Sequence, residues 1–127
     1  EVTDMAQELV FHKYQGSDSD YLVYDINKNH MELNDSMVRK IRNRSFGADL
    51  AGILVGPFVE NGDISMKIYD AENVDGNVGI RAFSRYLKDA GYVKNGNCVF
   101  RTPSGYVSVN EEENKEEFYQ TKIYCWC

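Results

Sequence analysis

The chain has 127 residues with a formal net charge of −6, and 43% of its residues are hydrophobic. This length is typical of one domain with its own core, so we expect a single domain over residues 1–127, with residues 1–7 as a tag or a disordered lead-in. The acidic balance argues against a nucleic-acid partner, because neutralising phosphates requires clustered Lys and Arg. No apolar run approaches the roughly 18–20 residues of a membrane span, and no signal-peptide pattern opens the chain. We therefore expect a cytoplasmic protein with no membrane partner.

The cysteines and histidines give no sign of a metal site. Cys98, Cys125 and Cys127 form an odd set without a disulfide framework. Cys125 and Cys127 lie two residues apart, with no second Cys/His cluster, which is poor evidence for zinc. His12 and His30 are far apart in the sequence and form no recognisable ligand pair. We therefore predict no metal, and we expect Cys98 to be a small core residue on a strand.

Local patterns predict many short strands and two helices. The predicted strands lie at residues 9–14, 21–26, 53–55, 65–69, 98–100 and 106–109 and from residue 118 onward, and the predicted helices lie at 37–42 and 79–90. The first two strands are expected to form a hairpin. The segment 46–52 is expected to be a loop, and a turn signal at 61–63 joins two further strands. The acidic run from Glu111 to Glu117 is expected to be a solvated hairpin loop.

The second predicted helix indicates the fold. Its apolar residues form a face broad enough to be covered by a sheet over much of the helix surface; they are Ile80, Ala82, Phe83, Tyr86, Leu87 and Ala90. Gly91 follows as a C-capping residue. Because strands outnumber helices by about three to one, we predict an α+β fold in which a curled mixed β-sheet wraps around this central α-helix.

The stretch before this helix is the most informative part of the sequence. It reads as a strand, a polar turn and a glycine-rich helix start that includes Gly76 and Asn77. Unpaired N–H groups at a helix start, together with the helix dipole, form an anion site, and glycine lets a ligand approach the backbone closely. We therefore predict that a carboxylate or phosphate of a small metabolite binds at Gly76 and Asn77. The alternative is a loop whose glycines only satisfy turn geometry.

Five segments in order resemble motifs of a known family. They are Phe11-His12-Lys13-Tyr14-Gln15-Gly16 with Asp20-Tyr21, Arg44-Ser45-Phe46-Gly47 through Gly52-Ile53-Leu54, Met66 to Ala71, Gly76-Asn77 to Arg81-Ala82-Phe83, and Thr102-Pro103-Ser104-Gly105. The first is similar to an opening strand and a Gly-Asn-Asp-Phe turn, and the fourth to Cys-Gly-Asn-Gly-x-Arg-Cys-Phe with one extra residue. Together they resemble the amino-terminal half, or lobe, of the diaminopimelate epimerases.

The resemblance implies a cofactor-independent amino-acid racemase or epimerase of lysine biosynthesis. In this family two cysteines, one from each half of a two-lobed molecule, exchange the proton on the substrate α-carbon. Helix N-termini hold the α-carboxylate and stabilise the developing negative charge. The resemblance implies that Gly76 and Asn77 bind the substrate. It also places Ser19 and Asp70 where the family has substrate-contacting asparagines.

The chain departs from the family where the chemistry is concentrated. The position of the first catalytic cysteine is taken by Asp75, or by Gly76 if the one-residue insertion is placed earlier. The aspartate of the family's Gly-x-Asp-Gly segment is displaced or replaced by Ala51, and the second lobe with its cysteine has no counterpart. Asp75 is our candidate acid/base, and burial or a neighbouring like charge must then raise the pKa of its carboxyl. The alternative role for Asp75 is helix capping.

Three functions remain open from the sequence. The first is an isomerase in which a homodimer or a partner chain supplies the second lobe. The second is a non-catalytic lobe that binds an amino acid or another small carboxylate. The third is a piece of a longer epimerase.

Overall fold

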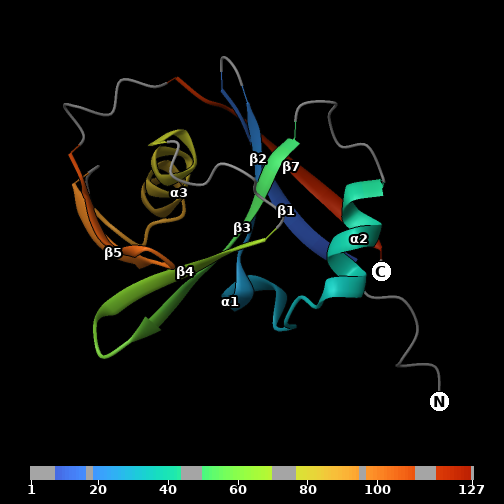
Figure 1. The fold of residues 1–127 in the computed structure, drawn as a ribbon, viewed down its shortest axis with the longest axis horizontal. Helices are drawn as coiled ribbons and strands as arrows, with labels where there is room; N and C mark the ends of the chain where they lie inside the picture. Colours follow the sequence, from blue (N-terminus) through green and yellow to red (C-terminus); the bar gives the residue numbers. More distant parts are fainter. Residues whose placement is uncertain are drawn as a thin grey trace.

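The computed structural model describes residues 8–16, 19–43, 50–69, 77–94, 97–110 and 117–126. These residues form one seven-stranded sheet in the order β6-β5-β4-β3-β2-β1-β7, together with three helices (Figure 1). The strands are β1 (Glu8–Gln15), β2 (Asp20–Tyr24), β3 (Leu50–Glu60), β4 (Asp63–Tyr69), β5 (Cys98–Thr102), β6 (Gly105–Val109) and β7 (Tyr119–Trp126). The helices are α1 (Ile26–Asn29), α2 (Asp35–Asn43) and α3 (Asn77–Asp89).

The sheet is mixed. Strand β1 pairs antiparallel with both β2 and β7, and the pairs β3–β4 and β5–β6 are also antiparallel. The pairs β2–β3 and β4–β5 are parallel. The predicted α+β class with a mixed sheet and few helices is therefore confirmed.

The two longer helices lie on opposite faces of the sheet, because side chains alternate along each strand. On β2, for example, Val23 belongs to the core around α3, whereas Leu22 belongs to the core around α2. Figure 1 shows α3 and α2 on opposite sides of the central strands. The α3 core also takes residues from β1, β3, β4, β5 and β6.

Helix α3 has the broad buried face that its sequence predicts. Its fully buried side chains are Ala82, Phe83, Ser84, Tyr86 and Leu87. The helix ends in a Schellman arrangement, in which the N–H of Tyr92 donates to the Leu87 carbonyl at 2.8 Å and Gly91 adopts a φ of 86°. The predicted C-cap at Gly91 is confirmed.

The predicted turn at residues 61–63 and the first predicted helix, which corresponds to α2, also form. In the β3–β4 turn Asn61 and Gly62 have φ values of 54° and 81°, which a tight hairpin turn requires. The N–H of Met37 in α2 donates to the side chain of Asn34 at 2.9 Å, so Asn34 caps this helix. Cys98 is buried on β5, as predicted.

Three local predictions are wrong. Strand β3 begins at Leu50 and not after the expected loop, because Gly52 pairs with Tyr21 of β2. The second strand ends at Tyr24 and not at Ile26, because Asp25 caps helix α1, which begins at Ile26. Strands β6 and β7 lie at opposite edges of the sheet, so the acidic segment between them does not close a hairpin. Residues 111–116 themselves lie outside the described residues.

Candidate functional site

The start of α3 packs against the start of β2. Gly79 is in the first turn of α3, and a Cβ atom added there would lie 3.0 Å from Cε1 and 3.3 Å from Cζ of Tyr21. Gly79 is buried, and only a residue without a side chain fits this close approach. The glycine at this position therefore brings the first turn of α3 against the ring of Tyr21.

The turn between β1 and β2 lies next to the start of β2, and a backbone hydrogen bond and an ion pair stabilise it. The N–H of Gly16 donates to the carbonyl of Ser19 at 2.9 Å. Next to it, Lys13 Nζ lies 3.7 Å from the Asp20 carboxylate, and both side chains are only 13% exposed. Because Ser19 is two residues from Tyr21 and Asn77 is two residues from Gly79, the Tyr21–Gly79 contact joins two of the segments that carry predicted site residues.

A third segment reaches this end of the sheet. Tyr21 pairs with Gly52 of β3, and Ile53 pairs with Tyr69, the last residue of β4. The start of β2 and the end of β4 therefore lie at one end of the sheet, on either side of β3. Asp70 follows Tyr69 in the sequence. Asp70, Asp75 and Gly76 lie outside the described residues.

The electrostatics of the α3 start favour an anion. Helix α3 has 13 residues, and its first turn carries no acidic side chain. The first N–H groups of a helix have no partner within it, and the helix dipole adds a partial positive charge there. Asn77 is the first residue of α3, so the helix begins two residues before the predicted start at Gly79. The described part of this region can therefore stabilise a carboxylate by backbone donors.

A second polar cluster lies near the other end of α3, and the sequence reasoning missed it. Asp25 is 1% exposed and accepts hydrogen bonds from the hydroxyls of Tyr86 and Tyr92 and from the backbone N–H of Asn27. Burial and the bond to Asp25 raise the pKa of Tyr86 above its ordinary value, so its hydroxyl is a neutral donor. The sequence offers one local signal for this cluster, namely that Asp25 can cap a helix. Its tyrosine partners could not be predicted in the same way, because they are distant in sequence.

His12 belongs to the same region. Its ring lies 4.9 Å from the Tyr86 ring, centroid to centroid, and its Nδ1 is 2.8 Å from the side-chain amide of Gln120. His12 is 7% exposed, and its Nε2 has no hydrogen-bond partner among the described residues. Burial lowers the pKa of His12 below 6.5, and the charges of Lys28 and Lys122 lower it further. The imidazole is therefore neutral near pH 7.

Cys98 does not supply the missing thiolate. It is 8% exposed, and its Sγ lies 3.3 Å from the hydroxyl of Ser84 on α3. Burial raises the pKa of this thiol above its ordinary value, which favours the unreactive protonated form. Within the described ranges, no group of three His, Cys, Asp or Glu side chains is arranged to hold a metal ion, and no helix there is long and apolar enough to cross a membrane.

The chain is similar in sequence to several enzymes named diaminopimelate epimerase. It is 32% identical over 125 residues to diaminopimelate epimerase 2 of Nostoc sp., covering 93% of this chain and 44% of that protein. It is 24% identical over 106 residues to the epimerase of Leptospira biflexa, covering 81% and 38%. It is 34% identical over 91 residues to that of Clostridium perfringens, covering 68% and 33%. No protein-family model matches the chain.

These matches agree with the sequence motifs in two respects: they point to the same family, and they cover most of the chain. The chain spans less than half the length of the relatives it matches, whereas most of its own length is covered. The matches therefore account for one part of a longer enzyme, as the motif order implies. The chain resembles the amino-terminal half of the diaminopimelate epimerases.

Proposed function

We propose that this chain is an epimerase lobe that binds an amino-acid substrate and exchanges the proton on its α-carbon. The observation that carries this proposal is the similarity to an enzyme named diaminopimelate epimerase over 93% of the chain. Diaminopimelate is the first substrate to test, because the relatives are named for it. In this proposal the sheet curls around α3, and the protein is located in the cytoplasm.

The α-carboxylate of the substrate binds at the start of α3. Gly76 and Asn77 donate backbone N–H groups to it, and Ser19 and Asp70 contact the rest of the substrate. The Tyr21–Gly79 contact supports this arrangement, because it joins the turn of Ser19 to the helix start. Helix donors fixed in advance stabilise the negative charge that develops when the α-proton leaves. This chemistry requires neither a cofactor nor a metal.

Asp75 acts as the acid/base of this lobe, in place of the family's first cysteine. Epimerisation requires a second group on the opposite face of the α-carbon, which returns the proton there. A second copy of this chain or a partner chain supplies that group. The state of Cys98 supports this assignment, because a buried protonated thiol on β5 is a poor base.

A second candidate function is a non-catalytic lobe that binds a small carboxylate. The sequence of residues 75–83, which holds an aspartate and no cysteine where the family motif has two cysteines, favours it. Under this alternative, α3 still presents its N-terminal donors to the ligand, and Asp75 only caps the helix. The two functions differ in what happens when Asp75 loses its charge.

Hydrogen–deuterium exchange at the α-carbon tests the proposal. The purified chain is incubated in heavy water with diaminopimelate and a panel of amino acids, and deuterium uptake is read by mass spectrometry. We expect uptake above the uncatalysed background that falls by two or more orders of magnitude in Asp75→Asn. Asp63→Asn, which changes an exposed carboxylate at the β3–β4 turn, is the matched control and should keep the exchange rate.

The outcomes separate the candidates. Carboxylate binding without exchange, retained in Asp75→Asn, would favour the binding lobe. Light scattering at micromolar concentration tests the source of the second lobe, since a strictly monomeric particle that still exchanges the proton would contradict the homodimer.

A further inference from the structure

We propose that His12 is an acid-sensitive switch for the edge strand β7: when the imidazole binds a proton, β7 separates from β1 while the other strands stay paired. The switch is independent of the proposed function, because His12 lies against Tyr86, in the half of α3 that is remote from the helix start. Separation of β7 exposes the backbone edge of β1, which can then pair with another strand.

Strand β7 is held by few buried side chains. It lies at one edge of the sheet, and among the described strands it pairs only with β1. Over residues 119–124 its side chains are exposed, except that of Ile123, which is partly buried. The neighbouring β1, in contrast, contributes Leu9, Phe11 and Tyr14 to the two cores. An element with few buried contacts opens at a smaller free-energy cost than the whole domain, so β7 can separate without unfolding the rest.

A hydrogen bond from β7 depends on the charge state of His12. The Nδ1 atom of His12 lies 2.8 Å from the side-chain amide nitrogen of Gln120 on β7. An amide nitrogen only donates, so Nδ1 accepts this bond and the neutral imidazole carries its proton on Nε2. Both ring nitrogens of a protonated imidazole are donors. Protonation therefore removes the acceptor that holds the Gln120 side chain.

The protonated ring also lacks acceptors. His12 is 7% exposed, and its Nε2 is the one buried side-chain nitrogen or oxygen among the described residues that has no hydrogen-bond partner. After protonation, both ring nitrogens are buried N–H donors of a charged group, and neither faces an acceptor. Such a group is costly to bury, whereas water can reach the ring once β7 has moved away.

Two lysines oppose a positive charge on the ring. Lys122 of β7 is directly opposite His12 in the β1–β7 register, so the two side chains project from the same face of the sheet. Lys28 of α1 has its Nζ 5.8 Å from the centroid of the Tyr86 ring, and this ring also contacts His12. Departure of β7 takes Lys122 away from the imidazole, so β7 is the element whose movement relieves the repulsion.

Two carboxylates act in the opposite direction, but tyrosine hydroxyls already donate to them. Asp25 accepts from Tyr86, and Asp89 accepts from Tyr14 at 2.7 Å. Burial and the two lysines outweigh these carboxylates and keep the pKa of His12 below 6.5. In the open state the imidazole has its ordinary pKa of about 6.5 and therefore binds the proton first. The open population then grows by at most about tenfold per pH unit as the pH falls from about 6.5 toward the folded-state pKa.

Hydrogen–deuterium exchange of the backbone amides of the full chain tests the inference between pH 7.5 and pH 5.5. Each rate is corrected for the pH dependence of the intrinsic exchange. We expect the protection of the β7 amides that bond to β1 to be constant above about pH 6.5 and to fall below it by at most about tenfold per pH unit. The amides of β3 should stay much better protected than those of β7 at every pH, because the rest of the sheet remains folded.

Two pairs of variants identify the group responsible. His12→Asn should make the protection of β7 independent of pH, and His30→Asn should leave the pH dependence in place. Lys122→Gln keeps the imidazole and should raise the midpoint of the His12 titration measured by NMR, since a repelling charge is lost. Lys40→Gln is the matched control, because Lys40 is an exposed lysine on α2, on the opposite face of the sheet. A purely structural role of Lys122 would not move this midpoint, and the measurement does not depend on the stability of His12→Asn.

The contrary results are distinct. Protection of β7 that does not change with pH, or that changes equally in His12→Asn, would overturn the inference. Equal protection of β7 and β3 at pH 5.5 would also overturn it, since protonation would then unfold the whole sheet. An unchanged His12 midpoint in Lys122→Gln would overturn the assignment of repulsion to β7. No ligand takes part in these measurements, so a failure of the proposed function leaves them unaffected.

Discussion

The hydroxyl of Tyr92 donates a hydrogen bond of 2.8 Å to the carboxylate of Asp25. Tyr86 on α3 donates to the same carboxylate oxygen, and Asp25 also caps α1 by accepting from the N–H of Asn27 at 2.9 Å. One buried carboxylate therefore joins the end of β2, helix α1 and the carboxyl-terminal half of α3. The opposite end of α3 carries the candidate site, so this anchor fixes the direction in which the helix start points.

Substitution of Asp25 should be strongly destabilising. Asp25→Ala removes the acceptor and leaves the Tyr86 hydroxyl buried at 1% exposure. An unsatisfied buried donor costs about 1–3 kcal/mol, and the lost bonds to the carboxylate add to this cost. We expect the free energy of unfolding to fall by about 3 kcal/mol or more in urea titrations. Tyr92→Phe, which removes one of the bonds, should cost about 1 kcal/mol, and an equal loss in both variants would contradict the shared-anchor interpretation.

The stability of the protein should depend on the protonation of His12. Burial, Lys28 and Lys122 lower its pKa in the folded state, although Asp25 and Asp89 act in the opposite direction. The unfolded state has the ordinary value of about 6.5 and therefore binds the proton first. The stabilising contribution is complete above pH 6.5 and is lost as the pH falls from about 6.5 through the folded-state pKa.

Thermal unfolding between pH 7.5 and pH 5 checks this prediction. His12→Asn should reduce the slope of melting temperature against pH in this window. The chain has two histidines, and the exposed His30 provides the control, since His30→Asn should keep the original slope. If His12→Asn leaves the slope unchanged, the neutral buried imidazole is not the group responsible.

Gly79→Ala should destabilise the start of α3. The new Cβ would lie 3.0 Å from Cε1 of Tyr21, and the ring is too buried to move freely. Overpacking costs about 1–3 kcal/mol, whereas alanine gains about 1 kcal/mol in helix propensity. We expect a net loss of about 1 kcal/mol by chemical unfolding. In a Tyr21→Leu background the same substitution should be neutral or stabilising, and a loss of equal size in both backgrounds would reject the contact as its cause.

The sequence predicted correctly those structural features that depend on contacts between residues close together in the chain. Asn34 before α2 and Gly91 after α3 act within one helical turn, so their positions could be read directly. Helix α1 was missed because it has four residues and follows the strand residues without a break in pattern. The hairpin expected before β7 was wrong because β7 pairs with β1, about a hundred residues earlier, and local patterns do not encode such pairing.

The candidate site was predicted only in part for the same reason. The helix start at Asn77 has a local signature, and the role of Ser19 followed from the family motif. Their proximity depends on the contact between Tyr21 and Gly79, which are distant in sequence.

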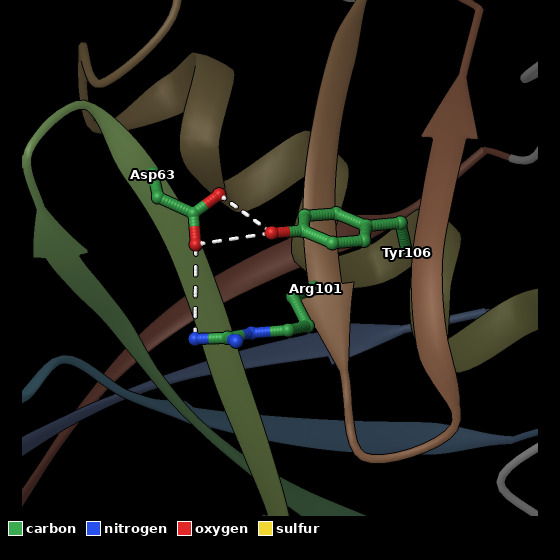
Figure 2. Close-up of polar contacts among 3 residues, drawn as sticks. All are labelled: Asp63, Arg101 and Tyr106. Atoms are coloured by element: carbon green, nitrogen blue, oxygen red, sulfur yellow. Dashed lines mark hydrogen bonds and ion pairs between the residues drawn. The ribbon is translucent and has the colours of Figure 1, made fainter.

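The ion pair on the outer sheet should contribute little to stability. Asp63 of β4 lies 3.7 Å from the guanidinium of Arg101 on β5, and the Tyr106 hydroxyl on β6 donates to the Asp63 oxygens at 3.3 and 3.4 Å (Figure 2). The Arg101 and Asp63 side chains are 52% and 42% exposed, so water and salt screen their attraction.

A double-mutant cycle of Asp63→Ala and Arg101→Ala measures this contribution. We expect a coupling free energy below about 1 kcal/mol that falls further in 1 M NaCl, where the Debye length is about 3 Å. The ion pair joins β4 to β5, and the register between these two strands consists of Ser65 paired with Arg101. If the ion pair contributed strongly to stability, its loss would therefore weaken the β4–β5 pairing first. A coupling above about 2 kcal/mol that resists salt would mean that this surface pair, and not the buried face toward α3, holds the β5–β6 hairpin on the sheet.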